Sequence, residues 1–361
     1  MKKNGIKLLV FRISVLVLAL VILFISPLAK FSANDDLNYI YSTFIGKKSE
    51  YNGVLEVWNI DTFESGTASK SSFLEMAGKE FQKKFKGIYV VVRNLTVGEC
   101  QNLLNSGELP DVLSCSYGVS EIIKDKIRPY EKTNKEILPN FLNSGKMGEM
   151  VYGLPWCFGV YSLISTKSKI EKAGKFVDGV KLSEIAFDSA YEYKSGKKTK
   201  KSASITFGTG EFLLPKNALN AYNKAESTQS KNSDIELIFK SQYSAYSAFL
   251  SNGATILLGT HRDICRMTNR ELKGKVSDVL YQPLLSWTDL VQFAFLCKNG
   301  DNLRKKYAEN FALFLTEGSN QKQVEKIGMF PVVAVNESQY KGIMLDIILE
   351  NFSDCEVKSL F

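Results

Sequence analysis

A strand, a helix and a second strand follow one another early in the chain and decide its fold class. Residues 53–58 read GVLEVW, residues 71–85 read SSFLEMAGKEFQKKF, and residues 88–92 read IYVVV. The apolar residues of the middle segment recur at helical spacing, lysines occupy the opposite face, and Gly87 ends the helix. The run at 88–92 does not alternate with polar residues, which is typical of a strand buried on both faces. This order predicts an α/β layer with a mostly parallel sheet.

Similar patterns continue along the chain. We expect a Gly/Pro-rich turn around 152–158 that leads into a strand at 159–165. Five lysines between 194 and 201 indicate a solvated loop, and the polar stretch at 227–233 is typical of a linker. Further helices are predicted at 98–104, 243–250 and 303–315, further strands at 110–114 and 254–258, and a strand or crossing segment at 329–333.

Composition and charge narrow the class of protein. The chain has 361 residues, enough for two domains. Its composition, 45% hydrophobic and 23% charged, is typical of a globular protein and excludes a disordered or fibrous one. The net charge is +8, but five cations precede the first acid, so the rest carries only about +3. That excess is too small for a nucleic-acid-binding surface.

The N-terminal segment predicts export. Three lysines in the first seven residues precede an apolar run from Leu8 to Ala29. This is the pattern of a secretory signal, and the run is also long enough to remain as a membrane anchor. Residues 1–33 are therefore a signal peptide or an anchor, and 34–52 are a tether. The positive charge keeps the N-terminus cytoplasmic and places the rest outside. Because the first cysteine is Cys100, a lipoprotein signal is absent.

No catalytic or metal-binding motif stands out. The six cysteines are scattered without a CxxC pair, so they predict buried small side chains rather than a metal site, with one disulfide left open. His261 is the single histidine, and we expect it at the surface or lining a cleft. The sequence contains no Gly-x-Ser-x-Gly, Walker A, GxGxxG, HExxH or EF-hand pattern, and we predict no cofactor. A glycosidase needs only two suitably spaced carboxylates, and 38 acidic residues leave that alternative open.

Aromatic side chains gather at strand ends and turns, where open α/β sheets bind ligands. An aromatic ring can cover the apolar face of a sugar while neighbouring polar groups bind its hydroxyls. We therefore expect Trp58 and Trp156 to stack on a ligand and Asp61 to accept hydrogen bonds from it. The full set of candidate ligand-binding residues is Trp58, Asp61, Tyr117, Trp156, Phe158, Tyr161, Arg262 and Trp287.

Several segments, in the same order, resemble the bacterial extracellular solute-binding proteins of family 1, the maltodextrin-binding type. The most recognisable is LNSGELPDV at 104–112, and FLSNGATI at 249–256 is similar to another family segment. The remaining matches are 53–58, 81–85 with 87–90, 152–156 with 161–163, and 308–315 with 328–332.

The resemblance implies a two-lobed fold of the periplasmic-binding-protein kind, type II, with a ligand cleft between hinged lobes. Mapped onto this chain, lobe one is 53–157 plus 280–329, and lobe two is 160–278 plus 330–361. The second lobe is reduced, because the stretch from Tyr161 to Phe249 is short. The family delivers a captured solute, usually a sugar, to the permease subunits of an ABC importer, and closure of the hinge is its working motion.

The first hypothesis is therefore a non-enzymatic, extracytoplasmic solute-binding protein with carbohydrate as its favoured ligand. A second is a membrane-anchored sensor or interaction module on the same scaffold, suggested by the apolar N-terminus and the small second lobe. A third is a secreted glycoside hydrolase, which requires two cleft carboxylates roughly 5–9.5 Å apart.

Overall fold

The computed structural model describes residues 48–172, 181–183, 191–195, 198–202, 205–209, 213–225, 237–251, 254–334 and 352–361. The predicted signal or anchor at 1–33 and the predicted linker at 227–233 lie outside these ranges. The predicted tether is described only from residue 48, and there it is strand rather than tether, since β1 spans Lys48–Ile60. Within the described ranges, no helix has the length and apolar character needed to cross a membrane.

The chain divides into two compact units. The described part of the smaller one consists of 48–53 and 82–89, where β1 and β2 begin. The larger one comprises 54–81 and the described residues from 90 to 361, and it contains most of the elements described below.

The first large sheet has the strand order β2-β1-β3-β16-β4, with β7 also paired to β16. β1 and β3 are parallel, with Val57 opposite Val112, whereas β16 runs antiparallel to β3, β4 and β7. The sheet is therefore mixed, and the predicted parallel pairing is found between β1 and β3. Its other strands are β2 (Lys86–Leu95), β3 (Val112–Cys115), β4 (Ile127–Arg128), β7 (Gly153–Phe158) and β16 (Val291–Cys297).

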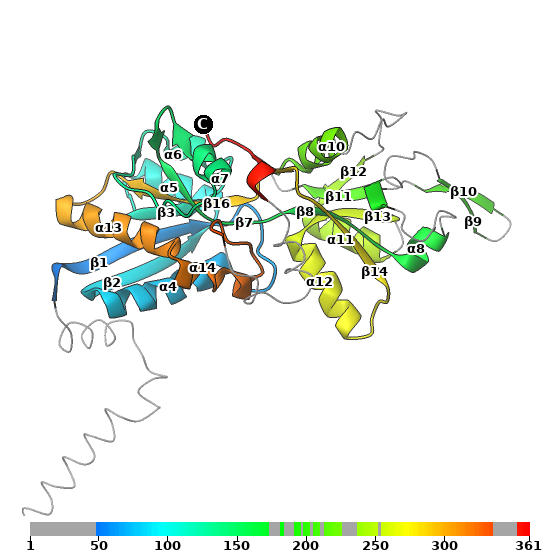
Figure 1. Ribbon diagram of the computed structural model, residues 1–361, viewed down its shortest axis with the longest axis horizontal. Helices are drawn as coiled ribbons and strands as arrows, with labels where there is room; N and C mark the ends of the chain where they lie inside the picture. Colours follow the sequence, from blue (N-terminus) through cyan, green and yellow to red (C-terminus); the bar gives the residue numbers. More distant parts are fainter. Residues whose placement is uncertain are drawn as a thin grey trace, which may run out of the picture. The chain divides into compact units, whose positions relative to one another are not determined.

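The second large sheet has the order β12-β11-β13-β8-β14. β11 is parallel to β12 and β13, while β8 is antiparallel to both of its neighbours. Figure 1 shows β7 leading directly into β8, so the chain passes from the first sheet to the second there. The strands are β8 (Tyr161–Thr166), β11 (Ile205–Thr209), β12 (Leu237–Ser241), β13 (Ile256–Thr260) and β14 (Val279–Leu284).

Helices connect the strands of both sheets. α4 buries Phe73, Leu74, Ala77 and Phe81, the apolar stripe expected from the sequence. α5 begins with a capping box in which Thr96 and Glu99 satisfy each other's backbone N–H groups. The longer helices are α4 (Lys70–Lys84), α5 (Val97–Asn105), α10 (Pro215–Ala225), α11 (Gln242–Leu250), α12 (His261–Leu272) and α13 (Asn302–Leu315). The shorter ones are α6 (Ser120–Ile123), α7 (Pro139–Ser144), α8 (Lys167–Lys172), α14 (Gly318–Gln321), η1 (Val324–Ile327) and η3 (Phe352–Asp354).

The two links between the sheets and the segment at 329–331 are hydrogen-bonded to one another. Phe158 and Phe330 exchange backbone hydrogen bonds of 3.0 and 2.9 Å, and Gly159 N–H donates to Leu290 C=O at 2.7 Å. The Thr288 hydroxyl also donates to Gly159 C=O, at 2.9 Å. These bonds join the β7–β8 link, the β14–β16 link and the segment at 329–331, which was expected to be a strand or crossing.

Several local expectations need correction. In the described part of the lysine-rich stretch at 194–201, the residues lie in two paired antiparallel strands rather than in a loop, β9 (Tyr191–Ser195) and β10 (Lys198–Ser202). The expected turn at 152–158 contains β7, because its partner β16 supplies a ladder that local sequence does not reveal. Four minor strands complete the fold: β5 (Lys146–Met147), β6 (Met150–Val151), β15 (Trp287–Thr288) and β17 (Glu356–Val357).

The predicted lobe boundaries differ from the strand pairing at two places. β14 belongs to the second sheet, so the chain returns to the first sheet after Leu284 rather than at 280. The C-terminal residues 352–361, expected in lobe two, contact the first: Asn140 donates to Phe352 C=O at 2.7 Å, and Ser120 donates to Leu360 C=O at 3.1 Å. The lobe ranges otherwise stay a prediction.

All six cysteines lie in the described part of the chain and are free thiols, so the disulfide left open by the sequence is not formed. Five are buried, as expected, and Cys265 is half-buried. Burial raises the pKa of Cys100 to about 11, which keeps it a neutral, unreactive thiol at neutral pH.

Gly145 provides a test of the packing between α7 and β7. A Cβ atom there would lie 1.9 Å from the carbonyl oxygen of Gly153, and this backbone oxygen cannot move aside cheaply. We expect Gly145→Ala to lower the free energy of unfolding by about 3 kcal/mol in urea titrations. The control is Gly98→Ala in α5, where a Cβ meets nothing within 4 Å. That change should alter stability by less than about 1 kcal/mol; equal effects of the two would contradict the packing described.

Candidate functional site

A pocket of about 360 Å³ lies between the loop that follows β1 and helix α12. β1 is parallel to β3, so this loop leaves the carboxyl end of a parallel pair, the place where α/β sheets commonly bind ligands. The pocket is lined by Asp61, Glu64, Ser65, Gly66, Thr67, Ala68, Ser69, Arg262 and Arg266.

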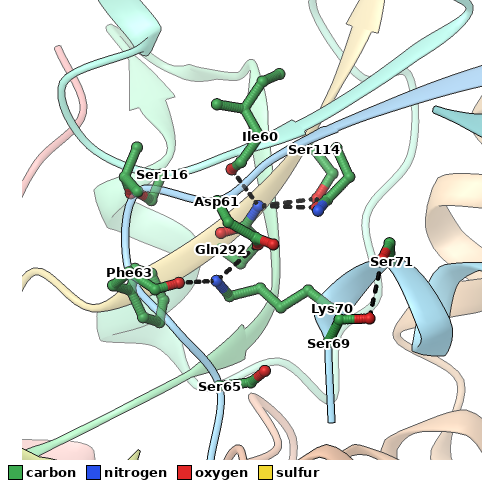
Figure 2. Close-up of polar contacts among 12 residues, drawn as sticks. Ile60, Asp61, Phe63, Ser65, Ser69, Lys70, Ser71, Ser114, Ser116 and Gln292 are labelled. Atoms are coloured by element: carbon green, nitrogen blue, oxygen red, sulfur yellow. Dashed lines mark hydrogen bonds and ion pairs between the residues drawn. The ribbon is translucent and has the colours of Figure 1, made fainter. Parts of the chain in front are cut away.

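A buried amide holds the end of β1 in place. Gln292 on β16 is fully buried, and its Nε2 donates to the Ile60 carbonyl at 3.2 Å and to the Ser114 hydroxyl at 3.0 Å (Figure 2). The same nitrogen lies 3.3 Å from Oδ1 of Asn59, which also accepts from Ser114 at 3.1 Å. Because a buried polar group without partners costs free energy, this network favours one arrangement of the strand end. It therefore fixes where Asp61 leaves the sheet.

Lys70, the first residue of α4, fixes the loop from the other end. Its side chain is fully buried, and Nζ donates to Asp61 Oδ1 at 3.0 Å and to the carbonyl of Phe63 (Figure 2). The ammonium also lies 3.9 Å from the centre of the Phe63 ring, a cation–π distance. A buried ammonium needs such partners, so the loop is shaped around this one cation.

The middle of the loop packs against η1. Thr67 donates from its N–H to Ile327 C=O at 3.1 Å and from its hydroxyl to Lys326 C=O at 2.8 Å. A Cβ on Gly66 would come within 2.7 Å of both the Gly328 carbonyl and the Cys265 sulfur. Only glycine allows this approach, and it leaves the loop residues 65–69 facing the pocket.

Helix α12 supplies the positive charges. Asp263 caps its first turn by accepting from Thr260 N–H at 3.1 Å. Arg262 and Arg266 are one turn apart, so they share a face of the helix, and both pair with Glu64 of the loop. The Arg266–Glu64 distance is 3.7 Å, and the Arg262 side chain is only 7% exposed whereas that of Glu64 is 57% exposed. With two carboxylates and two guanidinium groups, the lining has no net formal charge.

His261 lies beneath this site rather than at the surface or in a cleft, so that expectation was wrong. It is fully buried, with the Phe63 and Phe330 rings edge-on at centroid distances of 6.2 and 6.3 Å. Burial, and then the charge of Lys70, lowers the pKa of His261 to about 3, so the imidazole is neutral at neutral pH. Its backbone N–H donates to Val160 C=O at 2.9 Å, which ties α12 to the link between the sheets.

Of the eight candidate residues named from the sequence, Asp61 and Arg262 line the pocket. Trp58 and Trp156 are 1% and 0% exposed, so neither ring presents a face for the stacking role expected of it. Trp156 stacks on Phe73 at 5.0 Å with an interplanar angle of 5°, and the Trp58 indole N–H donates to Glu56 at 2.7 Å. A strand-end tryptophan has the same local sequence whether its ring faces a cleft or the core.

The four other candidates lie away from the pocket lining. Phe158 is buried in an aromatic cluster with Phe141, Phe330 and Phe352. Tyr161 is buried and donates to Asp289 at 2.8 Å, where burial raises the pKa of that carboxyl to about 6. Trp287 is buried, and Tyr117 is half-buried beneath the Lys358 ammonium.

The sequence reasoning missed most of the pocket lining. Glu64 and the small polar residues 65–69 were not proposed, although a run of small and hydroxyl residues between a strand and a helix is a signal for a ligand-facing loop. Arg266 could have been found from Arg262, because residues four apart share a helix face.

Comparison with known proteins supports the fold alone. No family model matches the chain, and no curated protein sequence matches it significantly. Solved structures that resemble it include a sugar transporter from Rhizobium etli in an open conformation (12% identity, 85% of this chain and 89% of that chain, TM-score 0.56). Others are the spermidine/putrescine ABC transporter substrate-binding protein PotD of Streptococcus pneumoniae (14%, 85% and 93%, 0.56) and the GacH receptor of Streptomyces glaucescens, solved with and without acarbose (16%, 79% and 81%, 0.52). The chain has the two-lobed fold of periplasmic substrate-binding proteins, as expected from the sequence.

The buried Lys70 should be important for stability. We expect Lys70→Met to lower the free energy of unfolding by about 1–3 kcal/mol, because the Asp61 carboxylate and the Phe63 carbonyl both lose their donor. The matched control is Lys79→Met on the exposed face of the same helix, which should change stability by less than about 0.5 kcal/mol. Chemical denaturation compares the two; a Lys70→Met protein as stable as the control would contradict the role given to this lysine.

His261 should make the free energy of unfolding depend on pH. Its pKa is about 3 in the folded protein and near 6.5 when unfolded, so between these values the unfolded chain binds the additional proton. Stability should therefore fall as pH drops from 6.5 towards 3, by at most about 1.4 kcal/mol per pH unit from this group. Asp289, with a raised pKa, acts in the opposite direction between about pH 6 and 4. Comparing His261→Gln with the wild type cancels that contribution; the variant should lose less stability on acidification, and parallel curves would count against this assignment.

Proposed function

We propose that the protein is an extracytoplasmic solute-binding protein of the family-1 type that captures a small neutral polar solute, most favourably a carbohydrate, and delivers it to an ABC importer. The observation that carries the proposal is the pocket at the carboxyl end of β1, whose lining is rich in hydrogen-bonding groups and has no net formal charge. The fold shared with substrate-binding proteins supports it, including one described as a sugar transporter.

The charge balance of the lining favours a neutral ligand over the charged alternatives. A polyamine would meet Arg262 and Arg266 in the same pocket as the two carboxylates, and an inorganic anion would meet Asp61 and Glu64. Placing like charges close together costs binding free energy, whereas hydroxyl groups can donate to carboxylates and accept from guanidinium groups. A polyhydroxylated solute is the class that uses both kinds of group.

Binding in this proposal relies on hydrogen bonds rather than on aromatic stacking. Asp61 and Glu64 accept from ligand hydroxyls, while Arg262, Arg266 and the Thr67 hydroxyl complete the set. Trp58 and Trp156 have no contact role, and neither do Tyr117, Phe158, Tyr161 and Trp287.

The Glu64 ion pairs suggest how ligand and closure are coupled. Glu64 belongs to the loop after β1 in the first lobe, and both arginines belong to α12 in the second. A solute that enters between them takes over part of this pairing, and hinge closure then re-forms contacts around it. Each lobe thus contributes one side of the binding site.

Binding is favoured over catalysis for a chemical reason. A glycosidase requires one carboxyl group that donates a proton, usually one in apolar surroundings. Here Asp61 is ion-paired with Lys70 and Glu64 with the arginines, an arrangement that suits hydrogen-bond acceptors. The basic, apolar N-terminal segment places the protein outside the cytoplasm in this proposal, either after cleavage or anchored to the membrane.

The test is ligand-induced stabilisation of the full-length protein. Maltotriose and a panel of neutral mono- and oligosaccharides, with spermidine for comparison, are screened by thermal unfolding. A sugar at about 100 times its Kd should add about 2.7 kcal/mol of stability, with little change between 50 and 500 mM NaCl. Stabilisation by spermidine alone, or binding that weakens steeply with salt, would contradict a neutral carbohydrate ligand.

Variants on one helix identify the site. Arg266→Gln should weaken binding of the stabilising sugar about 10-fold to 100-fold, as expected for loss of a charged hydrogen-bond donor. Arg270→Gln, one turn further along α12 and outside this pocket, should leave sugar affinity unchanged. If the two variants bind sugar equally well, the pocket is not the solute site.

A further inference from the structure

A second pocket, of about 300 Å³, lies within the lobe built on the second sheet and shares no lining residue with the first. Its walls come from α8 and the residue before it, the end of α11, the second half of α12 and the turn that follows α12. The lining residues are Thr166, Ser168, Lys169, Phe249, Leu250, Met267, Arg270, Lys275, Val276 and Ser277.

The lining of the second pocket is positively charged. Lys169, Arg270 and Lys275 contribute three cations, and none of the described residues that line it is acidic. The adjacent acid Glu271 does not line the pocket, and its carboxylate accepts from Val279 N–H at 3.0 Å. This differs from the first pocket, where Glu64 pairs with both arginines.

Arg270 has an unused donor. Its Nε atom is buried and, among the residues the structure describes, has no hydrogen-bond partner. A buried N–H of this kind costs free energy unless something accepts from it, and guanidinium groups bind oxyanions through two parallel hydrogen bonds. Arg266, one turn earlier on α12, differs in this respect, because its guanidinium group lies 3.7 Å from the Glu64 carboxylate.

Lys169 is held in position with its charge partly desolvated. Its Nζ lies 4.6 Å from the centre of the Phe249 ring and donates to Ala254 C=O at 3.3 Å. Burial, with a smaller contribution from Lys172, lowers the pKa of Lys169 to about 8. An anion in the pocket would offset both the burial and the repulsion between like charges.

Two hydroxyl groups in the pocket can bind a ligand. The carbonyl groups at the nearby end of α12 do not compete with a ligand for the cations. The Thr166 and Ser168 hydroxyls are 3.2 Å apart, so one donates to the other and the second proton is available to a ligand. The last carbonyls of α12 accept from the following turn: Lys275 N–H bonds to Arg270 C=O at 2.8 Å, and Gly274 N–H to Glu271 C=O at 2.8 Å. These carbonyls are therefore not left to bind the cations.

We propose that this second pocket is a binding site for a small phosphate-type oxyanion, held by Arg270, Lys169 and Lys275 and by the hydroxyls of Thr166 and Ser168. The site does not depend on the solute-binding function proposed for the first pocket. In this proposal, a dissolved anion provides negative charge in the second pocket, as the Glu64 carboxylate does beside Arg262 and Arg266 in the first.

Calorimetric titration of the full-length protein at pH 7 tests the proposal. Inorganic phosphate and glycerol 3-phosphate are added at constant ionic strength, with chloride as the reference anion. We expect saturable binding that Arg270→Gln weakens at least 10-fold and that Lys275→Gln also weakens. Lys275 is exposed, so its substitution tests charge without disturbing the core. The matched control is Lys273→Gln, at another exposed lysine of the same turn that does not line the pocket, and this variant should bind phosphate as the wild type does.

Three results would overturn the proposal. One is a heat signal that chloride reproduces at the same ionic strength, which would indicate general screening. Another is equal phosphate affinity in the wild type and in folded Arg270→Gln and Lys275→Gln proteins. A third is capture by phosphatidylglycerol vesicles with no binding of either soluble phosphate, which would make the pocket a site for membrane surfaces rather than for a small oxyanion.

Discussion

The structure depends above all on the backbone hydrogen bonds that join the two links between its sheets to each other and to the segment at 329–331. Phe158 and Phe330 are paired, Gly159 donates to Leu290, and His261 at the start of α12 donates to Val160. A Cβ on Gly159 would lie 2.2 Å from the His261 ring, so the segment also requires a glycine at this point. These contacts decide where α12 begins, and α12 carries the arginines of both pockets.

Burial of single polar groups determines the shape of the candidate site. Gln292 holds the end of β1, and Lys70 holds the loop through Asp61 and Phe63. These groups are the kind that cost free energy when their partners are missing, so the loop has few alternative conformations that satisfy them. The hydroxyl and carboxylate groups that face the pocket are thus arranged on a support held by the Gln292 amide N–H and the Lys70 ammonium.

The two pockets of α12 show how one helix can serve two electrostatic environments. Arg262 and Arg266 face acids contributed by the loop after β1, which leaves the first pocket without net charge. Arg270, one turn further, lies among lysines. Spacing along the helix brings each arginine to its own surroundings, and those surroundings decide whether a neutral solute or an anion is the better ligand.

The resemblance of several sequence segments to a known family implied the two-lobed fold, which the structure shares. Most helices could be predicted from the sequence because the apolar spacing in α4, α11 and α13 reports local structure directly. Two of the residues proposed from it, Asp61 and Arg262, line the first pocket, and their role in binding stays a prediction. The sequence did not reveal that Trp58 and Trp156 face the core, that His261 is buried, or that 152–158 contains a strand. Those outcomes follow from partners distant in the chain: Phe73 covers Trp156, Phe63 and Phe330 enclose His261, and β16 pairs with β7. Side-chain burial and strand pairing are set by such long-range contacts, so only the tertiary structure decided them.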